Sequence, residues 1–255
     1  MKLFVSDYDM TIYINENIND SVFKSIREWR NSGNIFAIAT GRNKFSIFEH
    51  IDRYSLEFDY VIANNGALIF NSNREIIFED IIDENIAYNV IKFLYNKFNG
   101  SVEITSNNEN ISVIKENDDY ELPFRVHKKI TIDEINTIKN IVQINKIIRK
   151  DSKNTENIAK IINNEFDRVI AYANIRTVDI VKYTVNKVNG VSFLEKVIKN
   201  NNKIIDKVLV AGDSNNDIEM IKKYDCYAQI NARENVKSIT NKYFYFISDI
   251  INKEI

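Results

Sequence analysis

Acidic residues follow strand-like apolar runs at two separate points of this 255-residue chain. Asp7 and Asp9 come shortly after the apolar run 3–5, and Asp213 follows the strand-like run 207–211 and a glycine. Neighbouring carboxylates repel each other unless a cation neutralises them or one of them keeps its proton. Three carboxylates would form an all-oxygen cluster, which suits a hard ion such as Mg²⁺. Mg²⁺ beside a nucleophile and a positive side chain is what phosphoryl transfer requires.

A third polar segment, Thr40-Gly41-Arg42, ends the apolar run 35–39. In open α/β sheets, ligands bind outside the carboxyl ends of the strands. Three strand ends would therefore bring carboxylates, hydroxyls and a cation to one edge of a sheet. An isolated Asp-x-Asp-x-Thr such as 7–11 is more often a solvated strand end, so the convergence of the three segments carries the prediction.

Apolar runs alternate with helical patterns at both ends of the chain. Strand-like runs at 2–6, 35–39 and 60–63 are separated by two helical patterns, and a helix at 190–200 precedes the run 207–211. This order is typical of a parallel sheet with crossover helices. We therefore expect an α/β fold with a Rossmann-like parallel-sheet core.

The middle of the chain has a different pattern, typical of an α+β module. A helical pattern at 83–98 is followed by a hairpin pattern at 102–113. Thr131 and Glu134 form a capping box that predicts a helix carrying Ile135, Ile138 and Val142. We accordingly expect a core made of 1–81 and 185–255, with an inserted α+β cap at 82–184.

Five stretches of the sequence resemble motifs of the haloacid dehalogenase (HAD) superfamily, specifically its Cof-like phosphatase branch. They are Asp7-Tyr8-Asp9-Met10-Thr11, Ile38-Ala39-Thr40-Gly41-Arg42, Ala63-Asn64-Asn65-Gly66-Ala67, Gly212-Asp213-Ser214-Asn215-Asn216-Asp217 and Ala228-Gln229-Ile230-Asn231-Ala232. Their order and spacing match over essentially the whole chain, and the inserted module lies where this branch carries its α/β cap.

The resemblance implies catalytic roles for the residues of the first two motifs. Asp7 would be the nucleophile that forms an aspartyl-phosphate, and Asp9 the general acid that then acts as base for water. Thr11 would orient the surroundings of Asp9. Thr40 would bind a phosphoryl oxygen, and Arg42 would contact substrate or pair with a neighbouring acid.

The resemblance also implies a Mg²⁺ site and phosphate contacts. Asp7, Asp213 and the backbone carbonyl of Asp9 would hold the ion. Asp217, which we group with these metal residues, and Asn216 would lie just outside them or touch the phosphate. We expect Gly41, Thr11, Arg42 and Asn216 to contribute to substrate binding.

The catalytic lysine is assigned by its distance from a helix glycine. Family members usually have lysine followed by glycine at the start of this helix, whereas Lys187 is followed by Val188, and the glycine is Gly190. Aligning Gly190 with the family's helix places Lys187 on the catalytic lysine. The alternative register would place Asn189 there, but asparagine carries no charge to offset phosphate. Met10 also replaces the common glycine of its motif.

These roles predict a Mg²⁺-dependent phosphohydrolase of a small phosphorylated metabolite, such as a sugar phosphate or a phosphorylated cofactor. The cap would close over the substrate and exclude bulk water. A phosphotransferase or phosphomutase with the same aspartyl-phosphate is the main alternative. A receiver module is about half this length and needs no cap, and a non-catalytic phosphate-binding protein would not need Asp7, Asp9, Lys187 and Asp213 together.

Composition restricts the partners and the compartment. With Lys+Arg 34 and Asp+Glu 36, the formal net charge is −2, so we expect no nucleic-acid partner. No stretch is apolar for long enough to cross a membrane, and a single cysteine, Cys226, fits a reducing compartment. We expect a cytoplasmic monomer or homodimer.

His50 and His127 lack metal-ligand spacing, so packing or surface positions are expected for both.

Overall fold

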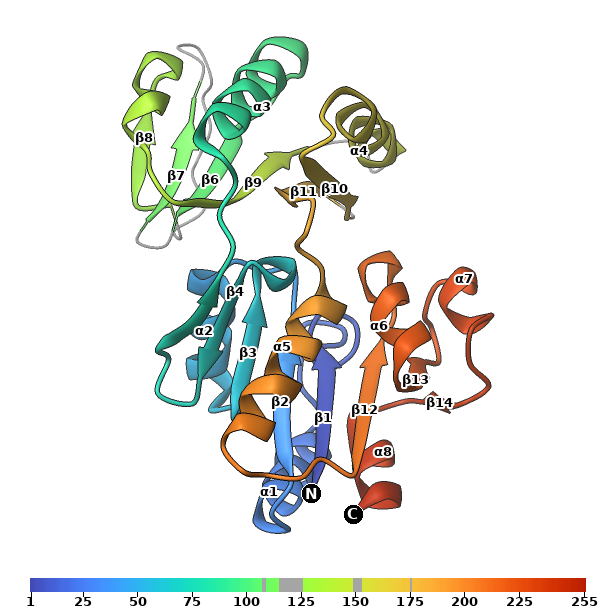
Figure 1. The fold of residues 1–255 in the computed structure, drawn as a ribbon. Coiled ribbons are helices and arrows are strands. Elements are labelled where there is room, and N and C mark those ends of the chain that lie inside the picture. The colour runs from blue at the N-terminus through green and yellow to red at the C-terminus, as the bar shows by residue number, and fades with distance from the viewer. Residues whose placement is uncertain (107–108, 115–125, 149–152, 175) are drawn as a thin grey trace. The chain divides into compact units, whose positions relative to one another are not determined.

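The computed structural model describes residues 1–106, 109–114, 126–148, 153–174 and 176–255. The chain divides into two compact units, one made of Met1–Phe78 and Asn186–Ile255 and the other of Glu79–Val185 (Figure 1). Each unit has its own sheet and its own buried apolar cluster. No helix in the described ranges combines the length and hydropathy of a membrane span.

The first unit is built on an eight-stranded sheet of order β14-β13-β12-β1-β2-β3-β4-β5. Its strands are β1 (Lys2–Asp7), β2 (Ile35–Ala39), β3 (Tyr60–Ala63), β4 (Leu68–Asn71), β5 (Ile76–Glu79), β12 (Lys207–Gly212), β13 (Asp225–Gln229) and β14 (Tyr243–Phe244). All neighbours from β14 to β3 are parallel, whereas β4 runs antiparallel to β3. The predicted α/β core with a parallel sheet is confirmed.

Helices cover both faces of this sheet. They are α1 (Asp20–Asn31), α2 (Lys44–Tyr54), α5 (Lys187–Asn200), α6 (Ile218–Lys223), α7 (Glu234–Lys237) and α8 (Ile247–Glu254), with short 3₁₀ helices η1 (Asn64–Gly66) and η3 (Asn215–Asp217). Because side chains alternate along a strand, Leu3 and Val5 join the apolar cluster that includes α5 and α6. Phe4 points to the opposite face, where its ring meets Trp29 of α1.

The parallel order explains how distant motifs reach one edge of the sheet. In neighbouring parallel strands the carboxyl ends lie at the same edge. β1 ends at Asp7, β2 ends one residue before Thr40, and β12 ends one residue before Asp213. The turn η1 follows β3 at this same edge.

The second unit has a six-stranded sheet of order β10-β11-β9-β6-β7-β8. Its elements are β6 (Val102–Ser106), β7 (Asn110–Val113), β8 (Lys128–Ile130), β9 (Ile141–Ile147), β10 (Val169–Ala173), β11 (Thr177–Lys182), α3 (Glu84–Lys97), α4 (Lys153–Glu165) and the 3₁₀ helix η2 (Ile132–Thr137). Neighbouring strands of this sheet are antiparallel, except that β7 and β8 are parallel. The unit is therefore of α+β type.

One predicted helix of this unit is wrong in extent. The capping box of Thr131 and Glu134 is present, but the helical segment ends at Thr137, and Val142 lies in strand β9. Asn140 has a left-handed φ of 55°, which interrupts a helix. β9 then pairs with both β6 and β11, and this long-range pairing outweighs the local apolar spacing that had predicted a longer helix.

Candidate active site

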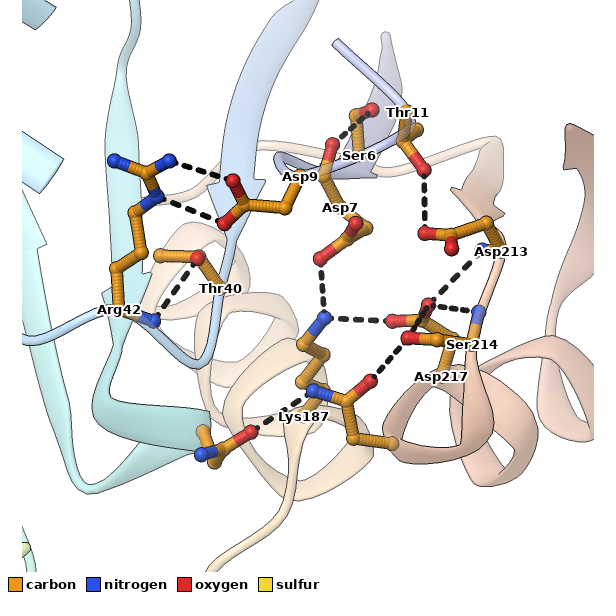
Figure 2. A network of polar contacts seen from close by, with 12 residues as sticks. Ser6, Asp7, Asp9, Thr11, Thr40, Arg42, Lys187, Asp213, Ser214 and Asp217 are labelled. Atoms are coloured by element: carbon orange, nitrogen blue, oxygen red, sulfur yellow. Dashed lines mark hydrogen bonds and ion pairs between the residues drawn. The ribbon is translucent and has the colours of Figure 1, made fainter. Parts of the chain in front are cut away.

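The chain reverses direction immediately after β1. The carbonyl oxygen of Tyr8 accepts hydrogen bonds from the backbone N–H groups of Ile12 (2.9 Å) and Tyr13 (2.8 Å). Met10 makes the turn with a left-handed φ of 61°, a conformation that glycine adopts more readily. The turn keeps Asp7, Asp9 and Thr11 at the same edge of the sheet (Figure 2).

Lys187 lies buried between two aspartates. It is the first residue of α5, whose N-cap Asn186 accepts a hydrogen bond from the Asn189 N–H at 2.8 Å. The Lys187 ammonium donates to Asp7 Oδ1 at 2.5 Å and to Asp217 Oδ1 at 2.6 Å (Figure 2). Lys187 therefore reaches the cluster with its charge, and Asn189 contributes its backbone N–H to the helix cap.

Two close approaches hold the parts of the cluster together, and both require glycine. A Cβ at Gly66 would lie 2.5 Å from the Asn186 carbonyl oxygen, and Gly66 also has a left-handed φ of 113°. A Cβ at Gly212 would lie 2.6 Å from the carboxyl carbon of Asp217. The first approach fixes the start of α5, and therefore Lys187, against the turn after β3. The second lets Asp217 pack against the end of β12.

Asp217 is held through both of its carboxylate oxygens. Its Oδ2 accepts the N–H groups of Asp213 and Ser214, each at 3.0 Å, and its Oδ1 accepts Lys187. It is completely buried. These contacts fit a residue that fixes the loop after β12 and orients Lys187.

Asp213 contacts Thr11 across the site. The Thr11 hydroxyl donates to Asp213 Oδ1 at 3.2 Å. Burial, followed by the charge of Asp217, raises the pKa of Asp213 to about 7. Burial also raises the pKa of Asp7 well above its usual value, although Lys187 acts in the opposite direction. An additional positive charge would favour ionisation of both.

This donor set fits a divalent metal ion. One oxygen atom from each of Asp7, Asp213 and Asp217 lies within 4.8 Å of the others. All three groups are carboxylates, whose oxygens hard cations prefer. Burial lowers the pKa of Lys187, but Asp217 and Asp7 outweigh this and raise it, so the lysine stays charged. One lysine cannot balance three carboxylates, and a divalent cation would supply the missing charge.

The Asp9 side chain lies outside this cluster. Its carboxylate accepts two hydrogen bonds from Arg42, from Nε to Oδ2 at 2.8 Å and from Nη2 to Oδ1 at 2.6 Å. The Asp9 side chain is 47% exposed. Of the metal residues we expected, Asp9 therefore contributes no carboxylate oxygen to the cluster, which leaves its backbone carbonyl as the atom that the resemblance assigns.

Thr40 and Gly41 lie in the loop that follows β2. Thr40 Oγ1 accepts the Arg42 N–H at 3.1 Å, so its hydroxyl hydrogen can point to an incoming oxygen. Gly41 lies between Thr40 and Arg42. Thr40 is buried, and a hydroxyl that can donate is the kind of group that binds a phosphoryl oxygen.

Asn216 connects two loops of the site. It donates from Nδ2 to Asn65 Oδ1 at 3.0 Å, and its Oδ1 accepts the Ser214 hydroxyl at 2.8 Å. Our sequence reasoning assigned no site role to Asn65 or Ser214. The signal was available for Asn65, because Asn64-Asn65-Gly66 follows a strand just as the other motifs do.

Comparisons with known proteins find similarity along almost the whole chain. A family model described as haloacid dehalogenase-like hydrolase matches residues 4–247. An uncharacterized protein of Mycoplasma capricolum is 26% identical over 276 residues, which cover 98% of this chain and 97% of that protein.

Solved structures share the fold over the whole chain. A haloacid dehalogenase-like hydrolase from B. subtilis is 17% identical, covers 100% of both chains and gives a TM-score of 0.82. A HAD subclass IIB sugar phosphatase is 19% identical, with a TM-score of 0.79 and coverage of 99% of this chain and 98% of that one.

Proposed function

Because the chain belongs to the haloacid dehalogenase-like hydrolase family, we propose that it is a Mg²⁺-dependent phosphohydrolase of a small phosphorylated metabolite. The observation that carries this proposal is the buried pairing of Asp7 with Lys187 at 2.5 Å, beside Asp213 and Asp217. A carboxylate in a closed, positively compensated position is suited to nucleophilic attack. Asp9, two residues away and half exposed, is suited to proton transfer.

The first step forms the aspartyl-phosphate. An oxygen of Asp7 attacks phosphorus, the bond from phosphorus to the leaving oxygen breaks, and Asp9 gives that oxygen a proton. Lys187 and the Thr40 hydroxyl face the negative charge that spreads over the phosphoryl oxygens.

The second step returns the enzyme to its starting state. Asp9, now a carboxylate, takes a proton from water as the water oxygen attacks phosphorus. The bond from phosphorus to Asp7 breaks, and inorganic phosphate leaves. Arg42 contacts both carboxylate oxygens of Asp9, and these two hydrogen bonds fix the orientation of the group that moves the proton.

The metal residues of this proposal are Asp7, Asp213 and the Asp9 backbone carbonyl. A bound Mg²⁺ would supply charge neutralisation for the phosphoryl group. Asp217 keeps its oxygens on Lys187 and on two backbone N–H groups, so its part in metal binding is to place Asp213 and Lys187.

The substrate class rests on the fold and on one structural likeness. We propose a sugar phosphate or a phosphorylated cofactor, and the likeness to a sugar phosphatase favours the first. Residues 82–184, most of the second unit, would act as the specificity-determining cap. The proposed place of action is the cytoplasm, and the proposed form is a monomer or homodimer.

The test is phosphate release from a panel of sugar phosphates, nucleotides and phosphorylated cofactors, with and without Mg²⁺. We expect Mg²⁺-dependent release of inorganic phosphate that disappears in Asp7→Asn. Folded protein that releases no phosphate with Mg²⁺ present would overturn the proposal. Transfer of the phosphoryl group to an added sugar, with no free phosphate, would identify a phosphotransferase instead.

A further inference from the structure

The Asp9–Arg42 pair rests on a cluster of aromatic rings formed by Tyr8, Tyr13 and His50. The Arg42 guanidinium carbon lies 5.0 Å from the centre of the Tyr8 ring and 5.6 Å from that of Tyr13. The two tyrosine rings are stacked, with centres 5.7 Å apart and planes 8° from parallel. Both rings therefore offer the negative aromatic face that attracts a guanidinium.

His50 of α2 fixes these rings from a distant part of the chain. Its Nδ1 lies 3.1 Å from the Tyr8 hydroxyl oxygen, and its ring stands edge-on to both tyrosines, at 88° to Tyr8 and 89° to Tyr13. Tyr8 is completely buried and His50 is 8% exposed. Tyr8 and His50 thus belong to the packed interior, and the partly buried Tyr13 packs against them.

Arg42 is consequently held from several sides. Nε and Nη2 donate to Asp9, and Nη1 donates to the Ser46 hydroxyl at 3.3 Å. Burial lowers the pKa of Arg42, but the hydrogen bonds and charge of Asp9 outweigh this and raise it, so the guanidinium stays charged. Its two-pronged contact is one that a lysine cannot reproduce.

We propose that Arg42 is a positioning residue for Asp9, and that Tyr8, Tyr13 and His50 set the place of the guanidinium. The inference rests on the proposed function, because Asp9 is there the group that transfers the proton. Asp9 is half exposed on a loop, so without Arg42 its carboxylate would sample several rotamers. Three N–H groups of Arg42 are already used by Asp9 and Ser46, which favours this role over direct phosphate binding.

The test compares substrates that differ in their need for a proton. An alkyl phosphate from the panel needs protonation of its leaving oxygen, whereas p-nitrophenyl phosphate has a leaving group stable as an anion. The ratio kcat/KM reports the steps up to leaving-group departure. We expect Arg42→Met to lower kcat/KM for the alkyl phosphate by about 100-fold, as for a misplaced catalytic group, and for the aryl phosphate by less than about 3-fold.

Three further variants separate positioning from a general loss of structure. Arg42→Lys keeps the charge and is expected not to restore the alkyl-phosphate activity. The double variant Asp9→Asn/Arg42→Met is expected to be no slower than Asp9→Asn alone, because both changes remove the same proton transfer. Arg74→Met is the matched control, since Arg74 also pairs with an aspartate, Asp52, and lies over a ring, Phe48, at 4.9 Å. It should leave both substrates within about 2-fold.

Two results would overturn the inference. An equal loss on both substrates, or a rise in KM with kcat unchanged, would show that Arg42 binds the phosphate and does not position Asp9. In an enzyme that is otherwise active, either result overturns this inference alone. A wild-type protein that hydrolyses no phosphate ester would overturn the proposed function together with it.

Discussion

Asp7 and Asp9 are two residues apart, and each has a basic partner, yet their surroundings differ. The Asp7 and Lys187 side chains are 6% and 1% exposed, whereas those of Asp9 and Arg42 are 47% and 18% exposed. Burial raises the pKa of Asp7, and the other carboxylates of the cluster add to this. Carboxylates of one type take different roles when their environments differ in this way. We therefore expect the buried one to form the covalent bond and the exposed one to move protons.

The two basic partners differ in the same sense. Lys187 is a compact charge that bridges two carboxylates, Asp7 and Asp217, inside the protein. Arg42 is a planar fork that holds one carboxylate at the edge of the site. The compact ammonium of Lys187 offsets the negative charge of the buried carboxylates, whereas the planar guanidinium of Arg42 fixes the orientation of the Asp9 carboxylate. Lys187 therefore compensates charge around Asp7, and Arg42 orients the group that transfers the proton.

The largest effect is expected from replacing the buried aspartate. Asp7→Asn keeps the size of the side chain but removes the nucleophile, and turnover should fall by roughly 10⁴-fold or more. Phosphate release under saturating Mg²⁺ measures it. Asp80→Asn is the control, because Asp80 also accepts hydrogen bonds from a lysine and a threonine but lies in the second unit. Turnover of Asp7→Asn close to that of this control would remove Asp7 from the mechanism.

Loss of the buried lysine should cost stability as well as activity. Lys187→Met leaves Asp7 and Asp217 buried without their partner, and the free energy of unfolding of the metal-free protein should fall by about 3–5 kcal/mol. Lys182→Met breaks the more exposed pair with Asp80 and should cost at most about 1 kcal/mol. Urea unfolding of both variants measures the difference. Equal losses would mean that the cluster is not charge-compensated by Lys187.

Metal binding should stabilise the protein more at high pH. The pKa of Asp213 is raised from 3.8 to about 7, so the metal-free folded protein keeps this proton between those values and loses its stabilising contribution as pH rises through 7. A bound Mg²⁺ would replace the proton and offset the negative charge of the carboxylates. A saturating concentration should raise Tm by about 5 to 10 °C near pH 8 and by less near pH 5.5. If Mg²⁺ raised the Tm of Asp213→Asn by as much as that of the wild-type protein, the ion would bind elsewhere.

The smallest effect concerns the turn that separates the two aspartates from Thr11. Met10 has a left-handed φ of 61° and is 41% exposed, so little apolar burial is lost if it is replaced. Met10→Gly should relieve strain and raise the free energy of unfolding by about 0.5–1 kcal/mol. Met10→Ala, which keeps a Cβ, should give no gain. The midpoints of urea unfolding compare the two variants. A higher midpoint for Met10→Ala would contradict the proposal that the left-handed backbone strains the turn.

The strand ends were predictable because buried parallel strands are continuous apolar runs. The runs 35–39 and 60–63 coincide with β2 and β3, and the polar residues that follow 35–39 led us to expect a site at this edge of the sheet. Strand β9 was not predictable in the same way, because its partners β6 and β11 are distant in sequence and outweigh local spacing.

Side-chain pairing was the least predictable part of the site. Spacing indicated that Thr11 and Arg42 belong to the site, but not that Thr11 would contact Asp213 or that Arg42 would hold Asp9 through two atoms. The contact of Tyr8 with His50 joins residues 42 positions apart and has no local signal. Such pairs depend on where the sheet and α2 place each side chain.

The most direct test of the two roles is to trap the covalent intermediate. Asp9→Asn is mixed with p-nitrophenyl phosphate and Mg²⁺, quenched in acid and examined by peptide mass spectrometry. The nitrophenolate leaving group needs no proton, so formation of the aspartyl-phosphate should proceed. Its hydrolysis should stall, because the Asp9 carboxylate that acts as base is missing. We predict a burst of nitrophenol and one phosphoryl group on the peptide that contains Asp7. A variant without burst or phosphorylated Asp7, under conditions in which the wild-type enzyme turns over, would contradict the assignment.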